Sequence, residues 1–254
     1  MLISHGGLVQ MAAGLLLLIQ CLLATADSAL EQHVVKVIDG DTVILADGQH
    51  VRLLGINTPE LARRGKAGDP GGMQASQWLK RRIEGRQVRL EVGQEKRDRY
   101  GRLLAHLFDQ SGEHINLALV AGGFATLSII PPNLNYSKRL LAAQKKARMA
   151  RRGLWGMERY QPRPLQAINL ERVRGWQRLL VTPRALSRHK KSYRLVINDQ
   201  FYLRVPRGNL LNFPDLDVYV GRSLEVRGWI SKYRGRYSLT IRHPSALVLL
   251  EERK

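Results

Sequence analysis

Three short segments of the chain, residues 38–42, 52–60 and 98–102, carry residue types that suit chemistry on a phosphate ester. Their sequences are IDGDT, RLLGINTPE and DRYGR, so carboxylates and guanidiniums stand beside turn-forming glycine or proline. Each segment alone has a structural explanation, because Asp-Gly favours turns and Thr-Pro-Glu often starts a helix. Together they supply oxygen atoms for a cation and positive charge for a phosphate.

Oxygen donors dominate the first two of these segments. Hard oxygen atoms come from Asp41, the Asn57 side chain, the Thr58 carbonyl and Glu60, and such ligands suit Ca²⁺ rather than zinc. A zinc site has little support, because the seven histidines form no HxxxH pair and Cys21 is the only cysteine. The sequence therefore predicts Ca²⁺ as the cofactor.

Two arginines stand close to these oxygen atoms. Arg52 lies in an expected strand between Val51 and two leucines, and Arg102 follows a turn that leads into a neighbouring strand. Two guanidiniums facing a bound cation hold a phosphate and stabilise the charge that gathers in a pentacoordinate transition state. The pattern predicts a phosphodiesterase, whereas a serine hydrolase has no G-x-S-x-G segment to support it.

The three segments, in this order and spacing, resemble the signature segments of the staphylococcal nuclease (thermonuclease) family. The resemblance covers residues 33–156, about half of the chain, and includes the Gly-Leu-Trp at residues 153–155. It implies an OB-fold barrel with three helices and Ca²⁺-dependent endonucleolysis of DNA and RNA that leaves 3′-phosphates. Its implied partner is therefore nucleic acid, and we infer no protein partner.

The resemblance also implies roles for individual residues. Asp41, Asn57 and Thr58 match the calcium site, and Asp39 matches a nearby acidic position. Glu60 matches the general base, and Arg52 and Arg102 match the phosphate clamp. Arg99 and Tyr100 are candidate substrate contacts.

Two positions depart from the pattern of the best-known family member. Asn57 replaces an aspartate, so the site keeps an oxygen but loses a charge, and we expect weaker binding of Ca²⁺. Ser128 and Ile130 occupy a segment in which that member presents two tyrosines to the nucleotide. The contacts of those tyrosines cannot be transferred to this chain.

The elements that would position these residues are short strands and three helices, an α+β composition. Alternating apolar residues and an Asp-Gly turn predict three antiparallel strands from residue 33 onward, and two further strands lie on either side of residues 98–102. Helices are expected near residues 73–83, 115–121 and 136–152. Five strands with an intervening helix predict a closed OB-fold barrel.

A second, smaller OB-like barrel is expected in residues 171–254, after a proline-containing linker at residues 157–170. This half contains five strand-like runs, with 18 Lys and Arg against 7 Asp and Glu. Trp229 and Tyr233 are candidate contacts for stacked bases, while Trp229 and Tyr237 have the alternative of packing in a core. The prediction is a basic domain that binds nucleic acid.

The N-terminal residues predict export. Residues 1–26 contain no Asp, Glu, Lys or Arg, and an apolar block is followed by Ala-Thr-Ala, which is typical of a cleaved signal peptide. The alternative is an uncleaved membrane anchor at residues 6–26. We expect a periplasmic or extracellular protein, with membrane contact only if this segment is retained.

The overall charge supports a polyanionic partner. The formal charge is +20, and a field of this size attracts nucleic acid through release of counterions. Two alternatives to an active nuclease remain: a nucleic-acid-binding protein on a nuclease-like barrel that has lost turnover, and a structural barrel that binds anionic lipid. The joint presence of Arg52, Glu60 and Arg102 favours the enzyme, because a binding module needs no carboxylate among its phosphate-binding arginines.

Overall fold

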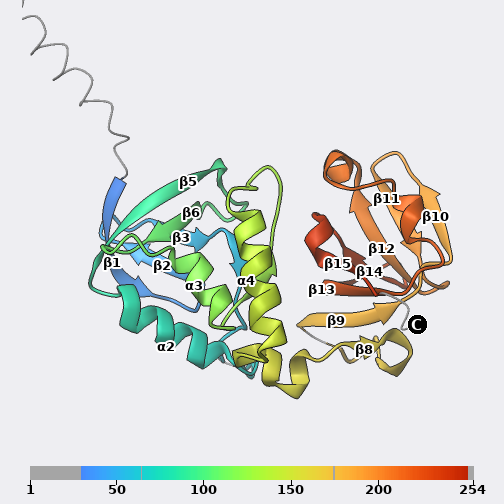
Figure 1. Ribbon diagram of the computed structural model, residues 1–254, viewed down its shortest axis with the longest axis horizontal. Helices are drawn as coiled ribbons and strands as arrows, with labels where there is room; N and C mark the ends of the chain where they lie inside the picture. Colours follow the sequence, from blue (N-terminus) through green and yellow to red (C-terminus); the bar gives the residue numbers. More distant parts are fainter. Residues whose placement is uncertain (1–29, 64, 174, 251–254) are drawn as a thin grey trace, which may run out of the picture.

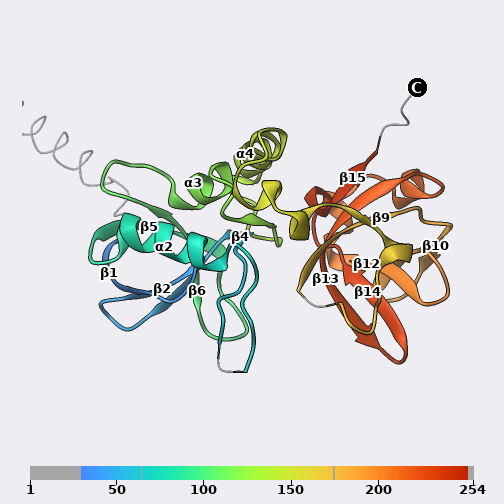
Figure 2. The same cartoon turned by 90° about the horizontal axis from the view of Figure 1, so that it is seen from below.

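Two β-rich lobes follow one another along the chain and lie side by side (Figures 1 and 2). The computed structural model describes residues 30–63, 65–173 and 175–250. The predicted signal peptide or anchor lies outside these residues. No helix in the described ranges is long and apolar enough to cross a membrane.

The first lobe is a closed five-stranded barrel, as the sequence predicted, and its strand order is β1-β2-β3-β6-β5. Its strands are β1 (Leu30–Val37), β2 (Thr42–Leu45), β3 (His50–Leu53), β5 (Gln87–Arg97) and β6 (Leu103–Phe108). The β3–β6 pair is parallel, and the other pairs are antiparallel. Alternate residues such as Val88 and Leu90 on β5 point inward and are buried in the core.

Three α-helices accompany this barrel in the described residues: α2 (Gly72–Ile83), α3 (Ile115–Ala121) and α4 (Ser137–Met149). The buried side chains of α2, which include Leu79 and Ile83, recur at helical spacing and join the barrel core. A two-stranded sheet of β4 (Gly55–Asn57) and β7 (Thr126–Ser128) lies beside α4 and was not anticipated. Its position matters because β4 carries Asn57.

The second lobe repeats the strand order of the first. Its path is β10-β11-β12-β14-β13-β9-β8, with a parallel β12–β14 pair that corresponds to β3–β6. The strands are β8 (Arg163–Pro164), β9 (Trp176–Val181), β10 (Ala185–Arg188), β11 (Ser192–Val196), β12 (Phe201–Pro206), β13 (Leu224–Tyr233), β14 (Arg236–Thr240) and β15 (Leu247–Leu249), which pairs with β13.

This second sheet differs from the expected five-stranded barrel in its first strand. Residues 182–184 divide that strand into β9, which pairs with β13, and β10, which pairs with β11. The interruption contains Pro183, which has no backbone N–H to donate to a sheet ladder. In the first lobe the undivided β1 makes the same two sets of pairings with β5 and β2.

The segment between the lobes is packed against both of them. It contains the short 3₁₀ helices η1 (Gly153–Gly156), η2 (Glu158–Tyr160) and η3 (Leu165–Ala167), and three more, η4 (Arg207–Asn212), η5 (Leu216–Tyr219) and η6 (Pro244–Ala246), lie in the second lobe. Trp155 and Tyr160 share a buried cluster with Trp176 of β9. The Tyr160 hydroxyl also donates a hydrogen bond to the carbonyl of Pro70 at 2.8 Å, so this segment joins the two lobes.

A buried ion cluster adds a second connection between the lobes. Glu225 on β13 accepts hydrogen bonds from Arg178 at 2.8 and 2.9 Å and from Arg227 at 2.6 Å. Arg148 on α4 reaches the same carboxylate at 3.1 Å. Helix α4 of the first lobe is therefore bound to the central strand of the second.

Candidate active site

The turn between β1 and β2 carries the acidic residues of the site. Ile38 N donates to the Thr42 carbonyl at 2.9 Å, which closes a loop over Asp39, Gly40 and Asp41. A Cβ at Gly40 would lie 2.7 Å from the Thr58 side chain, so only glycine permits this approach. The close approach lets Asp41 accept a hydrogen bond from the Thr58 N–H at 2.7 Å.

Arg52 connects Asp41 with Asn57. It lies on β3 opposite Thr42, and its Nη1 is 2.5 Å from the Asp41 carboxylate. Its Nη2 donates to the Asn57 side-chain oxygen at 2.9 Å and to the Ile56 carbonyl at 3.1 Å. The structure therefore brings Arg52, Asp41 and Asn57 together, as their spacing predicted.

The β4–β7 sheet fixes the position of Asn57. Gly55 starts β4 with φ of 75°, a left-handed conformation that favours glycine, and only Leu54 separates it from the end of β3. Thr126 of β7 donates its hydroxyl to the Asn57 carbonyl at 3.1 Å. The Asn57 amide in turn donates to the Thr58 carbonyl at 2.8 Å, so both predicted ligand residues belong to one hydrogen-bonded unit.

The donor chemistry of this unit fits a hard cation. Burial, together with the negative charge of Asp41, raises the pKa of Asp39 to about 6, which reflects unfavourable negative charge at this turn. A divalent cation would relieve that repulsion. Within the described residues, however, no cluster of three or more His, Cys, Asp or Glu side chains surrounds one point. A metal here would take amide and carbonyl oxygens of Asn57 and Thr58 in addition to carboxylates.

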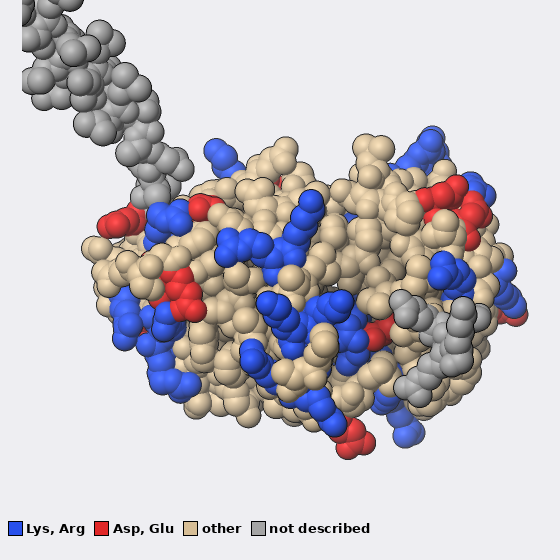
Figure 3. Space-filling view, viewed as in Figure 1, with Lys and Arg blue, Asp and Glu red and all other residues tan. Residues whose placement is uncertain are grey.

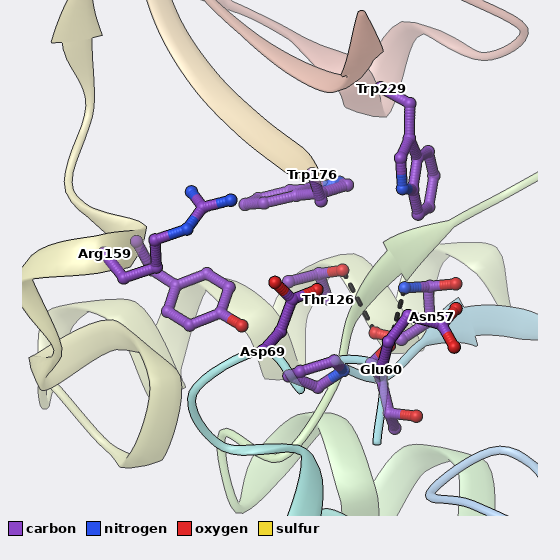
Figure 4. A pocket seen from close by; sticks show the side chains of 10 residues that line it. Asn57, Glu60, Asp69, Thr126, Arg159, Trp176 and Trp229 are labelled. Atoms are coloured by element: carbon purple, nitrogen blue, oxygen red, sulfur yellow. Dashed lines mark hydrogen bonds between the residues drawn. The ribbon is translucent and has the colours of Figure 1, made fainter. Parts of the chain in front are cut away.

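Among the described residues, Glu60 forms an ion pair with neither Arg52 nor Arg102. Its side chain is 66% exposed, and its carboxylate lies 3.9 Å from Arg63, a surface residue. Glu60 borders a narrow pocket that also contains Asn57, Thr58 and Asp69 (Figure 4). It is thus adjacent to the predicted metal ligands, and its exposed carboxylate is accessible to water.

Arg102 is held by the turn that precedes β6. Asp98 accepts hydrogen bonds from the backbone N–H groups of Tyr100 and Arg102 at 2.9 and 3.0 Å. The same carboxylate contacts the Arg102 guanidinium at 2.7 and 2.8 Å. Burial alone would raise the pKa of Asp98, but hydrogen bonds from Arg102 and Tyr100 outweigh it and lower the pKa.

Arg52 and Arg102 line one groove of about 560 Å³. The parallel pairing of β3 with β6 places Val51 opposite Leu103, so Arg52 on β3 lies close to Arg102, which immediately precedes β6. Arg99 and the exposed Tyr100 also line the groove, as do Ser128 and Ile130. The structure thus unites both predicted arginines with both candidate substrate contacts of the first lobe.

The second lobe completes this groove. Trp229, which is 44% exposed, and Arg242 also line it. Trp229 also borders the Glu60 pocket (Figure 4). Tyr233 is exposed but is not among the groove-lining residues, and Tyr237 belongs to the core of the second lobe. Arg242 was not predicted from the sequence, because its position in this groove depends on how the two lobes pack.

Positive charge also gathers on helix α4 (Figure 3). Helix α4 contains no acidic residue, and its exposed side chains include Lys138, Arg139, Lys145 and Lys146. Lys and Arg side chains gather over the middle of the face on which α4 lies (Figure 3). This distribution attracts polyanions over the Debye length of roughly 8 Å at physiological salt.

Comparisons with known proteins find similarity over the first lobe. A family profile described as "Staphylococcal nuclease homologue" matches residues 50–157. The thermonuclease of Staphylococcus hyicus is 38% identical over 125 residues, which are 48% of this chain and 73% of that protein. The thermonuclease of Staphylococcus intermedius is 39% identical over 129 residues, covering 49% of this chain and 76% of that protein.

Endonuclease YhcR of Bacillus subtilis (strain 168) is 32% identical over 143 residues, 52% of this chain but only 12% of that protein. In each of these three relatives the similarity covers about half of this chain.

Proposed function

Since this chain belongs to the staphylococcal nuclease family and is a nuclease, we propose that it is an exported, Ca²⁺-dependent endonuclease. Its substrates are DNA, RNA or both, and its products end in 3′-phosphates. The observation that carries the proposal is the groove lined by both Arg52 and Arg102, next to the oxygen cluster of Asp41, Asn57 and Thr58.

The proposed reaction is attack of water on the phosphorus of a phosphodiester. Glu60 accepts a proton from the water as its oxygen bonds to phosphorus. The bond from phosphorus to the 5′ oxygen breaks, the leaving oxygen takes a proton from solvent, and the phosphate remains on the 3′ side. Arg52 and Arg102 bind the non-bridging oxygens and stabilise the charge that develops on them.

A bound Ca²⁺ would supply further electrostatic stabilisation of the phosphate. Asp41, the Asn57 side chain and the Thr58 carbonyl are the residues that would hold it, and Asp39 adds negative charge nearby. Arg52 positions two of these residues through its contacts with Asp41 and Asn57. The same guanidinium thus orders the oxygen cluster and faces the substrate groove.

One assay tests the proposed chemistry. The purified protein is incubated with DNA and with RNA, in Ca²⁺ or in excess chelator, and the product ends are identified by mass spectrometry. We expect internal cleavage only with Ca²⁺ and 3′-phosphate ends. Cleavage that survives chelation would contradict the metal requirement, and 5′-phosphate ends would contradict the bond assignment. Binding without cleavage under all conditions would instead indicate a nucleic-acid-binding protein.

Export is the remaining part of the proposal, and it rests on the uncharged apolar block in residues 1–26. Cell fractionation followed by N-terminal sequencing should find the protein outside the cytoplasm, starting near Asp27. An intact Met1 on a membrane-bound protein would establish the anchor instead.

A further inference from the structure

Two exposed aromatic residues, one from each lobe, line the groove between the lobes. Tyr100, which is 68% exposed, comes from the first lobe, and Trp229 comes from β13 of the second. Both line the groove that holds Arg52 and Arg102. Exposed aromatic side chains in a positively charged groove are stacking platforms for the bases of single-stranded nucleic acid.

Trp229 differs from a residue that only packs the lobes together. It lies directly opposite Trp176 in the β13–β9 register, so both indoles project from the same face of the sheet. Trp176 is 6% exposed and contacts Trp155 and Tyr160, whereas Trp229 is 44% exposed. In Figure 4, Trp229 extends from the second lobe toward Asn57. The buried tryptophan holds the sheet in place, and the exposed one presents its ring to the groove.

Arginines from both lobes meet in the same groove. Burial and the nearby charges of Arg204 and Arg99 lower the pKa of Arg242. Arg99 belongs to the first lobe and Arg242 to the second, and each lines the groove. Among the described residues, neither of these two side chains forms an ion pair with a carboxylate. A phosphate between them would neutralise their mutual repulsion.

We propose that the groove between the lobes is a binding channel for a single strand, in which Trp229 stacks on an unpaired base and Arg242 contacts a phosphate next to the cleavage site. The inference rests on the proposed function and specifies its substrate class. In a duplex the faces of each base are covered by its neighbours, so stacking on Trp229 requires a base to leave the helix. Single strands meet this condition without the cost of unstacking.

The test measures binding and cleavage separately. Dissociation constants for a single-stranded oligonucleotide and a duplex of the same sequence are measured with chelator present, and kcat/KM is measured with Ca²⁺ at the same salt concentration. The variants are Trp229→Ala, Trp229→Phe and Arg242→Ala. The controls are Leu211→Ala, which truncates an exposed apolar side chain of the second lobe, and Arg222→Ala, which removes an exposed charge in the turn before β13.

We expect the wild-type protein to bind and cleave the single strand in preference to the duplex. Trp229→Ala should weaken single-strand binding by roughly 10- to 100-fold, the loss expected for one stacked base, and Trp229→Phe should restore most of it. Arg242→Ala should also weaken binding and reduce its salt dependence, because one phosphate contact is lost. The two control variants should resemble the wild type, and circular dichroism should show that all variants are folded.

Equal affinity of Trp229→Ala and wild type for the single strand would overturn the inference, as would a preference of the wild type for the duplex. Failure of the proposed function gives a different result. If the wild type cleaves no substrate but Trp229→Ala still weakens single-strand binding, the channel stands and the nuclease chemistry does not. If the wild type cleaves but the Trp229 and Arg242 variants match their controls, only the channel is refuted.

Discussion

Replacing Glu225 by glutamine tests the buried connection between the lobes. Glu225 is 2% exposed, and Arg178 and Arg227, which donate to it, are also buried. Burial alone would raise the pKa of Glu225, but the hydrogen bond from Arg178 and the charge of Arg227 outweigh it and lower the pKa to about 2. Glu225→Gln keeps the shape of the side chain but removes the charge that compensates these arginines.

The loss of stability expected for Glu225→Gln follows from that shift in pKa. A fall from 4.5 to about 2, at ~1.4 kcal/mol for each pKa unit, corresponds to roughly 3 kcal/mol of folding free energy at neutral pH. Removing one partner from a buried ion pair costs ~3–5 kcal/mol, which agrees with this value. Because the folded-state pKa is depressed, the contribution is complete above pH 4.5 and is lost as the pH falls toward 2.

Urea unfolding at pH 7 measures this loss of stability. Glu225→Gln should lower the free energy of unfolding by about 3 kcal/mol, whereas Asp199→Asn should change it by less than ~1 kcal/mol. Asp199 is a suitable control because it also pairs with an arginine, Arg184, but is almost fully exposed. A loss below ~1 kcal/mol for Glu225→Gln would refute the argument that this carboxylate compensates buried charge.

Four further predictions concern the site and the core of the first lobe. Glu60→Gln should lower kcat by about 10²–10⁴-fold with little change in the Kd for an oligonucleotide, because a general base acts mainly in the transition state; near wild-type turnover would remove that assignment. Arg102→Lys should also lose most of its kcat, since lysine keeps the charge but not the planar fork that holds two phosphate oxygens, and retention of activity would show that one point charge suffices. Asn57→Asp should lower the Ca²⁺ concentration that gives half-maximal activity, because it adds a negative oxygen ligand; an unchanged or higher requirement would argue that Asn57 is not a ligand. Burial lowers the pKa of His106 to about 4, and burial together with the charge of His106 lowers the pKa of His114 to about 3. The stability that these two neutral histidines contribute is therefore complete above pH 6.5. It falls by ~1.4 kcal/mol per histidine for each pH unit below 6.5. The free energy of unfolding, measured with urea at pH 7 and pH 5, should depend less on pH when both histidines are replaced by leucine. A pH dependence equal to that of the wild type would contradict the lowered pKa values of these histidines.

The barrel was predictable because the residues that define each of its strands and turns lie close together in the sequence. Short apolar runs separated by Asp-Gly turns define β1, β2 and β3, and alternating burial in β5 follows from the strand period of two. The contact between Asp41 and Arg52 was also predictable, since Asp41 directly precedes β2 and Arg52 lies on the neighbouring strand β3. The β4–β7 pairing was not, because three-residue strands carry too short a pattern to recognise.

The groove could not be derived from sequence in the same way. Trp229 and Tyr237 lie on adjacent strands, and composition does not distinguish the residue that faces the first lobe from the one that enters the core. That distinction depends on the packing of β13 and β9 against the segment after α4. The sequence around Arg242 gives even less indication of its place in the groove, since an arginine that follows a buried isoleucine, here Ile241, is a common pattern.

The packed segment at residues 157–170 has a consequence for the thermodynamics of substrate binding. Tyr160 and Leu165 are buried within it, so it does not act as a flexible tether between the lobes. A flexible tether would let the lobes sample many orientations, and a ligand that contacts both would then have to select one of them. Here folding has already fixed the orientation, so association need not include that loss of rotational freedom, and more of the contact energy is available as affinity.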